Sequence, residues 1–349
     1  MVNRRLDLRI EDPTARVDWD DLLATHPHAT FFHGSSWAKT LASAYGFRCR
    51  YVTAVAEGRL QGLLPVMEAN SWLTGKRGVS LPFTDECSPL VSDNVTARSL
   101  FDFALEDGQQ QGWKYLELRG GLDLFDELPE SVSYFGHVLP LESSFDVLFE
   151  NCDSAVRRAI RKAERCGVNV RFGTDLDSVR AYYRLHCRTR TKHGAPPQPF
   201  GFFRSLCDHV LQGGHGFIAL AEHQDRPVAG VVFFQFGGKA IYKFSASDER
   251  CQDLRGPNLV IWRSLQKLVA TGIKELNFGK TSMSNEGLRR FKRGWGSEER
   301  MIRYARYSFA TKNFVQFADL AAGAQRRIFS LLPVFCSRWI GRAVYAHLS

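Results

Sequence analysis

"GWKYLELRGG" at residues 112–121 and "GIKELNFGKT" at 272–281 follow the same pattern in the two halves of the chain. Each begins with a glycine of the kind that ends a helix and continues with the alternating apolar residues of a strand. The second copy ends in Gly-Lys-Thr, as a phosphate-binding loop does. Such a loop needs four residues between its glycines, whereas six separate Gly272 from Gly279. We therefore reject a nucleotide-binding loop and interpret the two stretches as an internal repeat.

The repeat extends upstream of both stretches. A pair of strands joined by a tight turn is predicted at 50–68 and again at 216–236, because alternating residues flank a short polar turn in each. A helix follows each pair, at 97–112 and at 257–272, where apolar residues recur at helical spacing. The matching order predicts a duplicated α/β (α+β) unit, with a mixed, mainly antiparallel sheet flanked by helices in each copy.

A chain of 349 residues is long enough to bury two separate cores. We therefore expect a first domain at 1–150, a second domain with the candidate active site at 151–310, and an amphipathic helical tail at 311–349. Within the tail, residues 326–345 place aromatic and aliphatic side chains on one face, with arginines beside them. Such a segment suits a membrane interface or packing against the first domain, and the pattern leaves both open.

Composition narrows the class of protein. The net charge of +9 favours anionic partners such as RNA, phosphorylated precursors or an acidic membrane surface. The eight cysteines lack the spacing of a zinc site, so we expect no metal and reduced thiols in a cytoplasm. No apolar stretch has the length of a signal-peptide core or a membrane span. We expect a cytoplasmic protein, either free or attached at the inner face of the membrane.

Three stretches are the most specific in the chain. They are "SSWAKTLASAYGF" (35–47), "VRRAIRKAERCGVNV" (156–170) and "LNFGKTSMSNEGLRRFKRGWG" (276–296). The last combines a strand ending in Phe-Gly, a polar loop and the pattern Gly-Leu-x-x-Phe-Lys-x-x-Trp-Gly. Together with the duplicated units, they resemble the GNAT acyltransferase superfamily, and within it the Fem aminoacyltransferases and the BioF2-like acetyltransferase domains. The resemblance covers the chain from about residue 31 to residue 307.

The resemblance implies an N-acyltransferase. Fem proteins move an aminoacyl group from a charged tRNA to an amine of a peptidoglycan precursor, and GNAT relatives move an acyl group from coenzyme A. It therefore implies transfer from aminoacyl-tRNA or acyl-CoA to an amine of a cell-envelope precursor, peptidoglycan or polysaccharide, with no tightly bound cofactor. The alternative is a non-catalytic duplicate that binds a lipid-linked precursor or a partner at the membrane surface.

Lys292 is the first candidate catalytic residue, because it matches a lysine that the Fem family places in its active cleft. Held between Phe291 and Trp295, its ammonium group could stabilise the oxyanion or hold a phosphate of the donor. Trp295 would then contribute to the substrate site. The alternative is that the two aromatic residues form one buried helical face and that Lys292 is a solvated cation.

Three further residues are candidates for the same site. Asp248 follows a predicted strand and could orient the amine or accept its proton, although an ordinary turn aspartate has the same pattern. Asn258 lies at a helix start that could hold a phosphate. Lys192 belongs to a basic stretch, 186–194, in which a phosphate contact and a plain basic loop fit equally well.

The predicted helix at 154–167 carries the densest positive charge. Arg157, Arg161 and Arg165 recur every four residues with Lys162 beside them, opposite an apolar stripe. This face suits the phosphates of RNA or of a lipid-linked precursor, although a solvated face without a ligand is the alternative. No motif for reading a nucleic-acid sequence accompanies it, so we expect no sequence-specific DNA binding.

The segment before the second long helix departs from acetyl-CoA-binding GNAT proteins. Those carry a glycine-rich turn whose bare N–H groups reach the pyrophosphate. Here "CQDLRGPNLV" (251–260) has its glycine at a different spacing, and Pro257 has no N–H. The first half also lacks a glycine before its helix. This departure favours tRNA over coenzyme A as the carrier of the donor.

Overall fold

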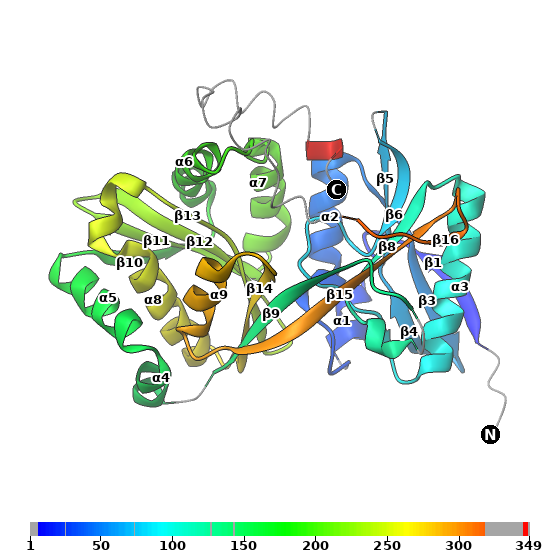
Figure 1. Cartoon of the computed structure of the whole chain (residues 1–349), viewed down its shortest axis with the longest axis horizontal. Coiled ribbons are helices and arrows are strands. Elements are labelled where there is room, and N and C mark those ends of the chain that lie inside the picture. Colours follow the sequence, from blue (N-terminus) through cyan, green and yellow to red (C-terminus); the bar gives the residue numbers. More distant parts are fainter. Residues whose placement is uncertain are drawn as a thin grey trace. The chain divides into compact units, whose positions relative to one another are not determined.

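The computed structural model describes residues 6–24, 26–72, 74–125, 128–141, 144–317 and 345–347 (Figure 1). The chain forms two compact units. Unit 1 consists of Met1–Tyr134, Met301–Leu320 and Ala346–Ser349, and unit 2 consists of Phe135–Arg300 and Ala321–Tyr345.

Unit 1 contains two groups of paired strands. Strands β1 (Asp7–Glu11), β3 (Tyr51–Ala56), β4 (Arg59–Leu64) and β7 (Leu90–Val91) form an antiparallel sheet in that order. The other group runs in the order β15 (Glu298–Ser308), β8 (Tyr115–Arg119), β6 (Gly75–Val79), β5 (Met67–Ser71) and β2 (Arg48–Cys49), with β16 (Asn313–Phe314) paired to β15. Only β6 and β8 run parallel among the register pairs of unit 1 described in the structure.

The helices of unit 1 are α1 (Trp19–Ala24), α2 (Ser35–Tyr45) and α3 (Asn94–Gln111), with short 3₁₀ turns at Phe31–His33 and Leu122–Leu124. Helix α3 begins where the Asp93 carboxylate accepts a hydrogen bond from the Thr96 N–H, and it ends at Gly112 in the left-handed conformation. Its apolar face packs on strands β3 and β4. The predicted helix end at Gly112 is confirmed.

Unit 2 has the strand order β10 (Asn169–Gly173), β11 (Gly216–His223), β12 (Arg226–Phe236), β13 (Lys239–Ser247), β14 (Glu275–Ser282) and β9 (Val132–Pro140) (Figure 1). The pairs from β10 to β13 are antiparallel, and β13 and β14 are parallel. The helices are α4 (Phe145–Asn151), α5 (Ser154–Arg165), α6 (Leu176–Lys192), α7 (Phe200–Leu206), α8 (Gly256–Ala270) and α9 (Glu286–Arg293). A π-turn at Cys207–Leu211 and a 3₁₀ helix at Glu249–Leu254 complete the unit.

Alternation along the strands of unit 2 places helices on both faces of its sheet. Ala219, Val231 and Phe233 belong to the core that α5 and α8 cover. Gly230 faces the other way, where a Cβ would lie 3.1 Å from the Tyr182 ring of α6. The glycine in this strand therefore lets α6 approach the sheet closely. Both units thus contain a mixed sheet with flanking helices, and the predicted fold class is confirmed.

The division of the chain differs from the boundaries expected at 150/151 and 310/311. Unit 2 begins inside β9, because Leu139 and Leu148 are buried in the core of unit 2. The segment Met301–Leu320 returns to unit 1, where β15 pairs with β8 and Ala305 joins the core. The amphipathic segment expected in the tail falls mostly outside the described residues. No helix within the described ranges is long and apolar enough to cross a membrane.

Candidate active site

The parallel strands β13 and β14 of unit 2 separate before they end. Their register pairs join residues 239–241 to 275–277, although β13 continues to Ser247 and β14 to Ser282. In sheets of this type, ligands bind beyond the carboxyl ends of parallel strands. We call the carboxyl-terminal halves of β13 and β14, which do not pair with each other, the strand opening.

Lys292 lies on the β14 side of the strand opening. Its side chain is buried, and its ammonium group donates hydrogen bonds of 2.9 Å to the carbonyl oxygens of Gly279 and Lys280. Gly279 has a φ of 72°, and its N–H donates to the Asn277 side chain instead of a neighbouring strand. Lys292 therefore ties α9 to two backbone carbonyls of β14, and it is not a solvated cation.

Trp295, the aromatic partner of the motif, is also buried, with 1 % of its surface exposed. Its indole Nε1 has no hydrogen-bond partner among the described residues. The ring belongs to the apolar core of unit 2, with Leu139, Phe278 and Val156. The structure thus gives Trp295 a place in the core, as the alternative interpretation of the motif expected.

His137 on β9 is a neighbour of Lys292 that sequence reasoning missed. Its side chain has no exposed surface, and neither ring nitrogen has a hydrogen-bond partner among the described residues. Nδ1 lies 4.0 Å from the Glu299 carboxylate. Burial lowers the pKa of His137 to about 4, and the positive charge of Lys292 adds to that effect. The imidazole is therefore neutral at neutral pH, and no sequence pattern marks it, because a lone histidine in a strand has no signature.

Asp248 occupies the end of β13 but is tied to two arginines. Its carboxylate accepts hydrogen bonds of 2.6 Å from both Arg188 and Arg250, and its Oδ1 also accepts from the Arg250 N–H at the start of the following 3₁₀ helix. The hydrogen bond from Arg250 is the main cause that lowers the pKa of Asp248 to about 2. Such a carboxylate is a poor proton acceptor, which argues against the role of base that we considered. Lys192 nearby pairs with Glu249 at 2.8 Å.

A pocket of about 580 Å³ lies in unit 2 between α5, the start of α8, and α9. Four cationic side chains line it, and Asp153 is the acidic residue among its walls. The four cations are Arg158, Lys162, Arg255 and Arg290. Within the described part of the chain, no ion pair engages Lys162, Arg255 or Arg290. We call this feature the cationic pocket, and its excess of positive charge favours an anionic ligand.

Of the cations of α5 that were predicted to bind substrate, some line the cationic pocket and others do not. Lys162 lines the cationic pocket, and Arg158, which the sequence analysis did not choose, lines it as well. Arg161 instead lies over the Phe149 ring at 5.3 Å, and Arg157 donates to the Glu150 carbonyl at 3.4 Å. Arg165 is absent from the pocket walls. The helix phase follows from its buried apolar stripe, which turns positions 158 and 162 toward the pocket.

The start of α8 contributes side chains more than backbone groups to the pocket. Asn258 lines it, as predicted for a helix start near a phosphate. The N–H groups of Asn258 and Leu259 already donate to the Arg255 carbonyl, and Pro257 has none. The positive charge of the pocket therefore comes from arginine and lysine side chains.

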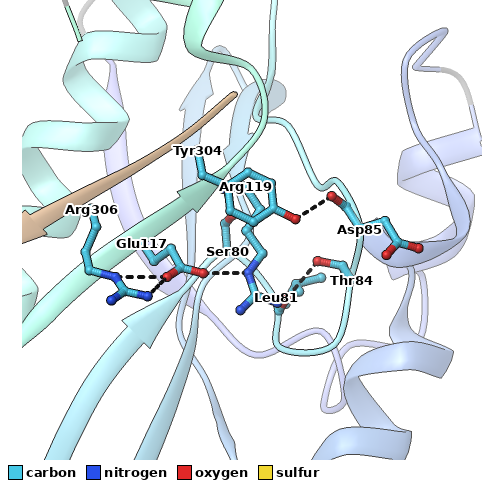
Figure 2. A network of polar contacts seen from close by, with 8 residues as sticks. All are labelled: Ser80, Leu81, Thr84, Asp85, Glu117, Arg119, Tyr304 and Arg306. Atoms are coloured by element: carbon cyan, nitrogen blue, oxygen red, sulfur yellow. Dashed lines mark hydrogen bonds and ion pairs between the residues drawn. The ribbon is translucent and has the colours of Figure 1, made fainter. Parts of the chain in front are cut away.

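In unit 1, a network of polar contacts joins β8, β15 and the loop that follows β6 (Figure 2). Glu117, in the middle of β8, is buried between Arg119 and Arg306. Burial alone would raise its pKa, yet the two guanidinium groups hold that pKa below its usual value. Arg119 also donates to the Leu81 carbonyl, and the Tyr304 hydroxyl donates to the Asp85 carbonyl at 2.6 Å. The loop after β6 is thereby fixed over the strand ends.

Comparison with known proteins identifies a domain within the chain. Residues 151–293 match the model of the acetyltransferase (GNAT) domain, a range that includes Lys292 and all residues that line the cationic pocket except Gly294. The crystal structure of FemX has a TM-score of 0.68 at 14% sequence identity, covering 85% of this chain and 96% of FemX. The chain contains a GNAT-type acetyltransferase domain, and its fold is similar to that of FemX. No curated protein matches it.

Two further solved structures resemble this GNAT protein. A tandem GNAT protein from the clavulanic acid biosynthesis pathway has a TM-score of 0.55 at 12% identity, covering 87% of this chain and 98% of that one. L-PGS from Bacillus licheniformis has a TM-score of 0.55 at 12% identity, covering 93% of this chain and 96% of that one. At these identities the likeness is one of fold. It agrees with the two related units described above.

Proposed function

We propose that this GNAT protein is an N-acyltransferase that moves an acyl or aminoacyl group from a phosphate-bearing donor to an amine of a cell-envelope precursor. The acceptor would belong to peptidoglycan or to a polysaccharide. The observation that carries the proposal is the cationic pocket, which lies beside the motif helix α9 inside the GNAT-matched residues.

The charge of the cationic pocket defines the donor class. Four cations face one carboxylate, and three of those cations are without ion pairs among the described residues. Both candidate donors bring phosphates, since coenzyme A carries a pyrophosphate and an aminoacyl-tRNA carries its backbone. Guanidinium groups bind phosphate oxygens in a bidentate manner, whereas a glycine-rich loop would use backbone N–H groups. The side-chain character of this pocket supports aminoacyl-tRNA as the first donor to test, with acyl-CoA as the second.

In the proposed reaction, the acceptor amine attacks the donor carbonyl at the strand opening. A bond forms between the amine nitrogen and the carbonyl carbon, while the bond to the tRNA ribose oxygen or to the thiol sulfur breaks. The amine releases its proton to solvent, and the leaving group takes one up. Lys292 is bonded to two carbonyls of β14, and its positive charge favours the oxyanion that develops on the carbonyl.

The acceptor proposal rests on the Fem-like fold, since Fem proteins modify amines of peptidoglycan precursors. An envelope precursor that is lipid-linked would place the reaction at the cytoplasmic face of the membrane. The net charge of +9 agrees with contact to an anionic surface.

Calorimetric titration tests the cationic pocket directly. The purified protein is titrated with coenzyme A and, separately, with deacylated tRNA, each at low and high salt. For whichever of the two ligands binds the wild type, we expect Arg290→Ala to lower the affinity by about tenfold, since the substitution removes one phosphate contact. Arg184→Ala is the matched control, because Arg184 is exposed on α6 and does not line the pocket. An absence of heat with both ligands, or equal losses in the two variants, would contradict the proposal.

A second function is favoured by the hydrogen bonds of Lys292 and Asp248. Both groups serve the protein's own backbone and arginines, so the chain could be a non-catalytic GNAT duplicate that binds a lipid-linked precursor or a partner at the membrane. That function predicts binding in the calorimeter without transfer. Incubation of the protein with radiolabelled alanyl-tRNA or acetyl-coenzyme A and an amine-bearing peptidoglycan precursor decides between the two.

A further inference from the structure

We propose that Tyr182 and His186, two buried residues of α6, form a positioning pair that fixes the β13 side of the strand opening. The proposal rests on the proposed function, since it assigns these residues to the geometry of the transfer site. Neither residue lines the cationic pocket, so their effect is separable from donor binding.

Strand β13 carries a bulge within the strand opening. Gly230 of β12 pairs with Ala246 and Val232 pairs with Lys243, so that Phe244 and Ser245 together oppose one residue. Phe244 has a φ of 49°, a left-handed conformation that is costly for an aromatic residue. A bulge of this kind leaves backbone groups without partners among the hydrogen bonds between the strands, and it changes the direction of the strand. The bulge begins three residues after Ile241, the last residue of β13 that pairs with β14.

A carbonyl that leaves the ladder in a buried place needs a new donor. The Tyr182 hydroxyl supplies it by donating to the Phe244 carbonyl oxygen. Tyr182 is fully buried, and its ring lies under Gly230, where any larger residue would displace it. The left-handed residue of the bulge is therefore held from α6 and not by the sheet.

His186 completes the arrangement from one helical turn further along α6. Its Nδ1 lies 3.4 Å from the Tyr182 hydroxyl oxygen. Because the single hydroxyl hydrogen of Tyr182 points to the Phe244 carbonyl, Nδ1 must be the donor in this contact, which fixes the Nδ1–H tautomer. Burial lowers the pKa of His186 to about 3, so the ring stays neutral and keeps this tautomer.

The same helix holds the rest of the β13 edge. Thr189 Oγ1 donates to the Ser247 carbonyl at 3.1 Å and accepts from the Ser247 N–H at 3.0 Å. Two residues on α6, Tyr182 and Thr189, thus form hydrogen bonds to the backbone at the two ends of the segment 244–247. Lys292 has the corresponding role on β14, where its ammonium group donates hydrogen bonds to two backbone carbonyls. Each strand at the opening is held by side chains from a helix that packs beside it.

Transfer rates depend on the alignment of the reacting atoms, and small misplacements of the surrounding backbone reduce them by large factors. We therefore expect Tyr182→Phe, which keeps the ring and removes the hydroxyl, to free the bulge. We expect His186→Phe to act in the same direction, because it removes the donor that orients the hydroxyl. His186→Asn should restore function in part, because its amide N–H can donate from the place of Nδ1.

The test compares the full-length wild type with these three variants. Hydrogen–deuterium exchange of residues 242–248 reports on the bulge, and calorimetry with coenzyme A and with deacylated tRNA reports on the cationic pocket. Transfer is followed with radiolabelled alanyl-tRNA and with acetyl-coenzyme A, using an amine-bearing peptidoglycan precursor as acceptor. Thermal unfolding is recorded for every variant.

We expect Tyr182→Phe to raise exchange of residues 242–248 about tenfold and to lower kcat about tenfold, with the donor KM unchanged. His186→Asn should lie closer to the wild type than His186→Phe in both measurements. Unchanged exchange in Tyr182→Phe overturns the proposal, and so does a rate loss that follows the Tm equally in both His186 variants. A wild type that transfers from neither donor refutes the proposed function and the positioning role with it, while the exchange data still decide whether Tyr182 holds the bulge.

Discussion

The ammonium nitrogen of Lys292 lies 2.9 Å from the carbonyl oxygen of Gly279. A second bond of the same length reaches the Lys280 carbonyl. Taking an ammonium ion out of water is costly, and charge-assisted hydrogen bonds to two carbonyls offset that cost. The motif lysine therefore stabilises the shape of β14, whatever it contributes to a reaction.

Lys292→Ala should accordingly destabilise the protein. Two carbonyls would lose their donor in a buried place, so we expect the free energy of unfolding to fall by about 2–4 kcal/mol. Arg293→Ala is the control, because Arg293 is the exposed cation next along α9 and should change stability by about 0.5 kcal/mol or less. Urea unfolding measures both. A catalytic lysine without a structural role would leave the unfolding curve of Lys292→Ala unchanged.

Substitutions that remove positive charge from the cationic pocket should make the affinity for the ligand less sensitive to salt concentration. Each phosphate contact that is removed lowers the slope of log affinity against log salt by about one. We expect the double variant Lys162→Ala/Arg290→Ala to show a slope about two smaller than the wild type. Arg157→Ala/Arg161→Ala is the charge-matched control on the other side of α5. Equal slopes in the two double variants would place the ligand elsewhere.

His137 should make stability depend on pH. Its pKa is lowered to about 4 in the folded protein, from an unfolded value of 6.5. The unfolded chain therefore binds a proton first, so the stabilising contribution is complete above about pH 6.5 and is lost as the pH falls towards 4. His137→Phe should flatten the difference in Tm between pH 7.5 and pH 5. An identical difference in the variant would mean that His137 does not carry this titration.

Asp248→Asn separates a structural carboxylate from a base. The folded pKa of about 2 means that Asp248 is ionised at all pH values where the protein is assayed. A general base typically contributes a factor of about 10²–10⁴ to the rate, whereas we expect a loss below about tenfold here. The Asn side chain keeps the acceptor for the Arg250 N–H. Steady-state transfer kinetics provide the measurement, and a loss beyond a hundredfold would restore the base hypothesis.

Glu117→Gln should lower the stability of unit 1 without changing the affinity for the donor. The change leaves Arg119 and Arg306 around an uncharged side chain in a buried site, which costs about 3–5 kcal/mol of stability. Asp123→Asn is the control, because its pair with Arg303 is largely exposed and contributes about 1 kcal/mol or less. Differential scanning calorimetry measures the stability of both variants. Affinity for coenzyme A or tRNA should stay at the wild-type value in both, since the cationic pocket lies in unit 2.

Much of the fold could be predicted because its signals are local. Gly112 and Gly272 both have positive φ values at the ends of long helices, as their sequence contexts predict. The duplicated order of strands and helices is likewise a periodic pattern. The unit boundary inside β9 could not be predicted, because it depends on which core Leu139 joins and no local pattern encodes that.

The candidate site was less predictable for the same reason. On α5, four-residue spacing identifies a charged helix, but the packing of Val156 and Ile160 decides whether Arg157 or Arg158 faces the pocket. The bulge at Phe244 depends on a hydroxyl 62 residues earlier in the chain, and sequence patterns do not record such contacts. Asp248 shows the limit most plainly, since its position after a strand suggested chemistry that Arg188 and Arg250 suppress.

The way the chain divides has a consequence for biosynthesis. Residues 135–300 of unit 2 form one uninterrupted stretch, whereas unit 1 needs Met301 and the residues after it. On the ribosome, Glu117 emerges long before Arg306, so its second guanidinium partner does not yet exist when the first strands are made. Although it comes first in the gene, the sheet of unit 1 stays incomplete until β15 has been made, and a nascent chain stopped before Met301 would expose an unfinished sheet to chaperones and proteases.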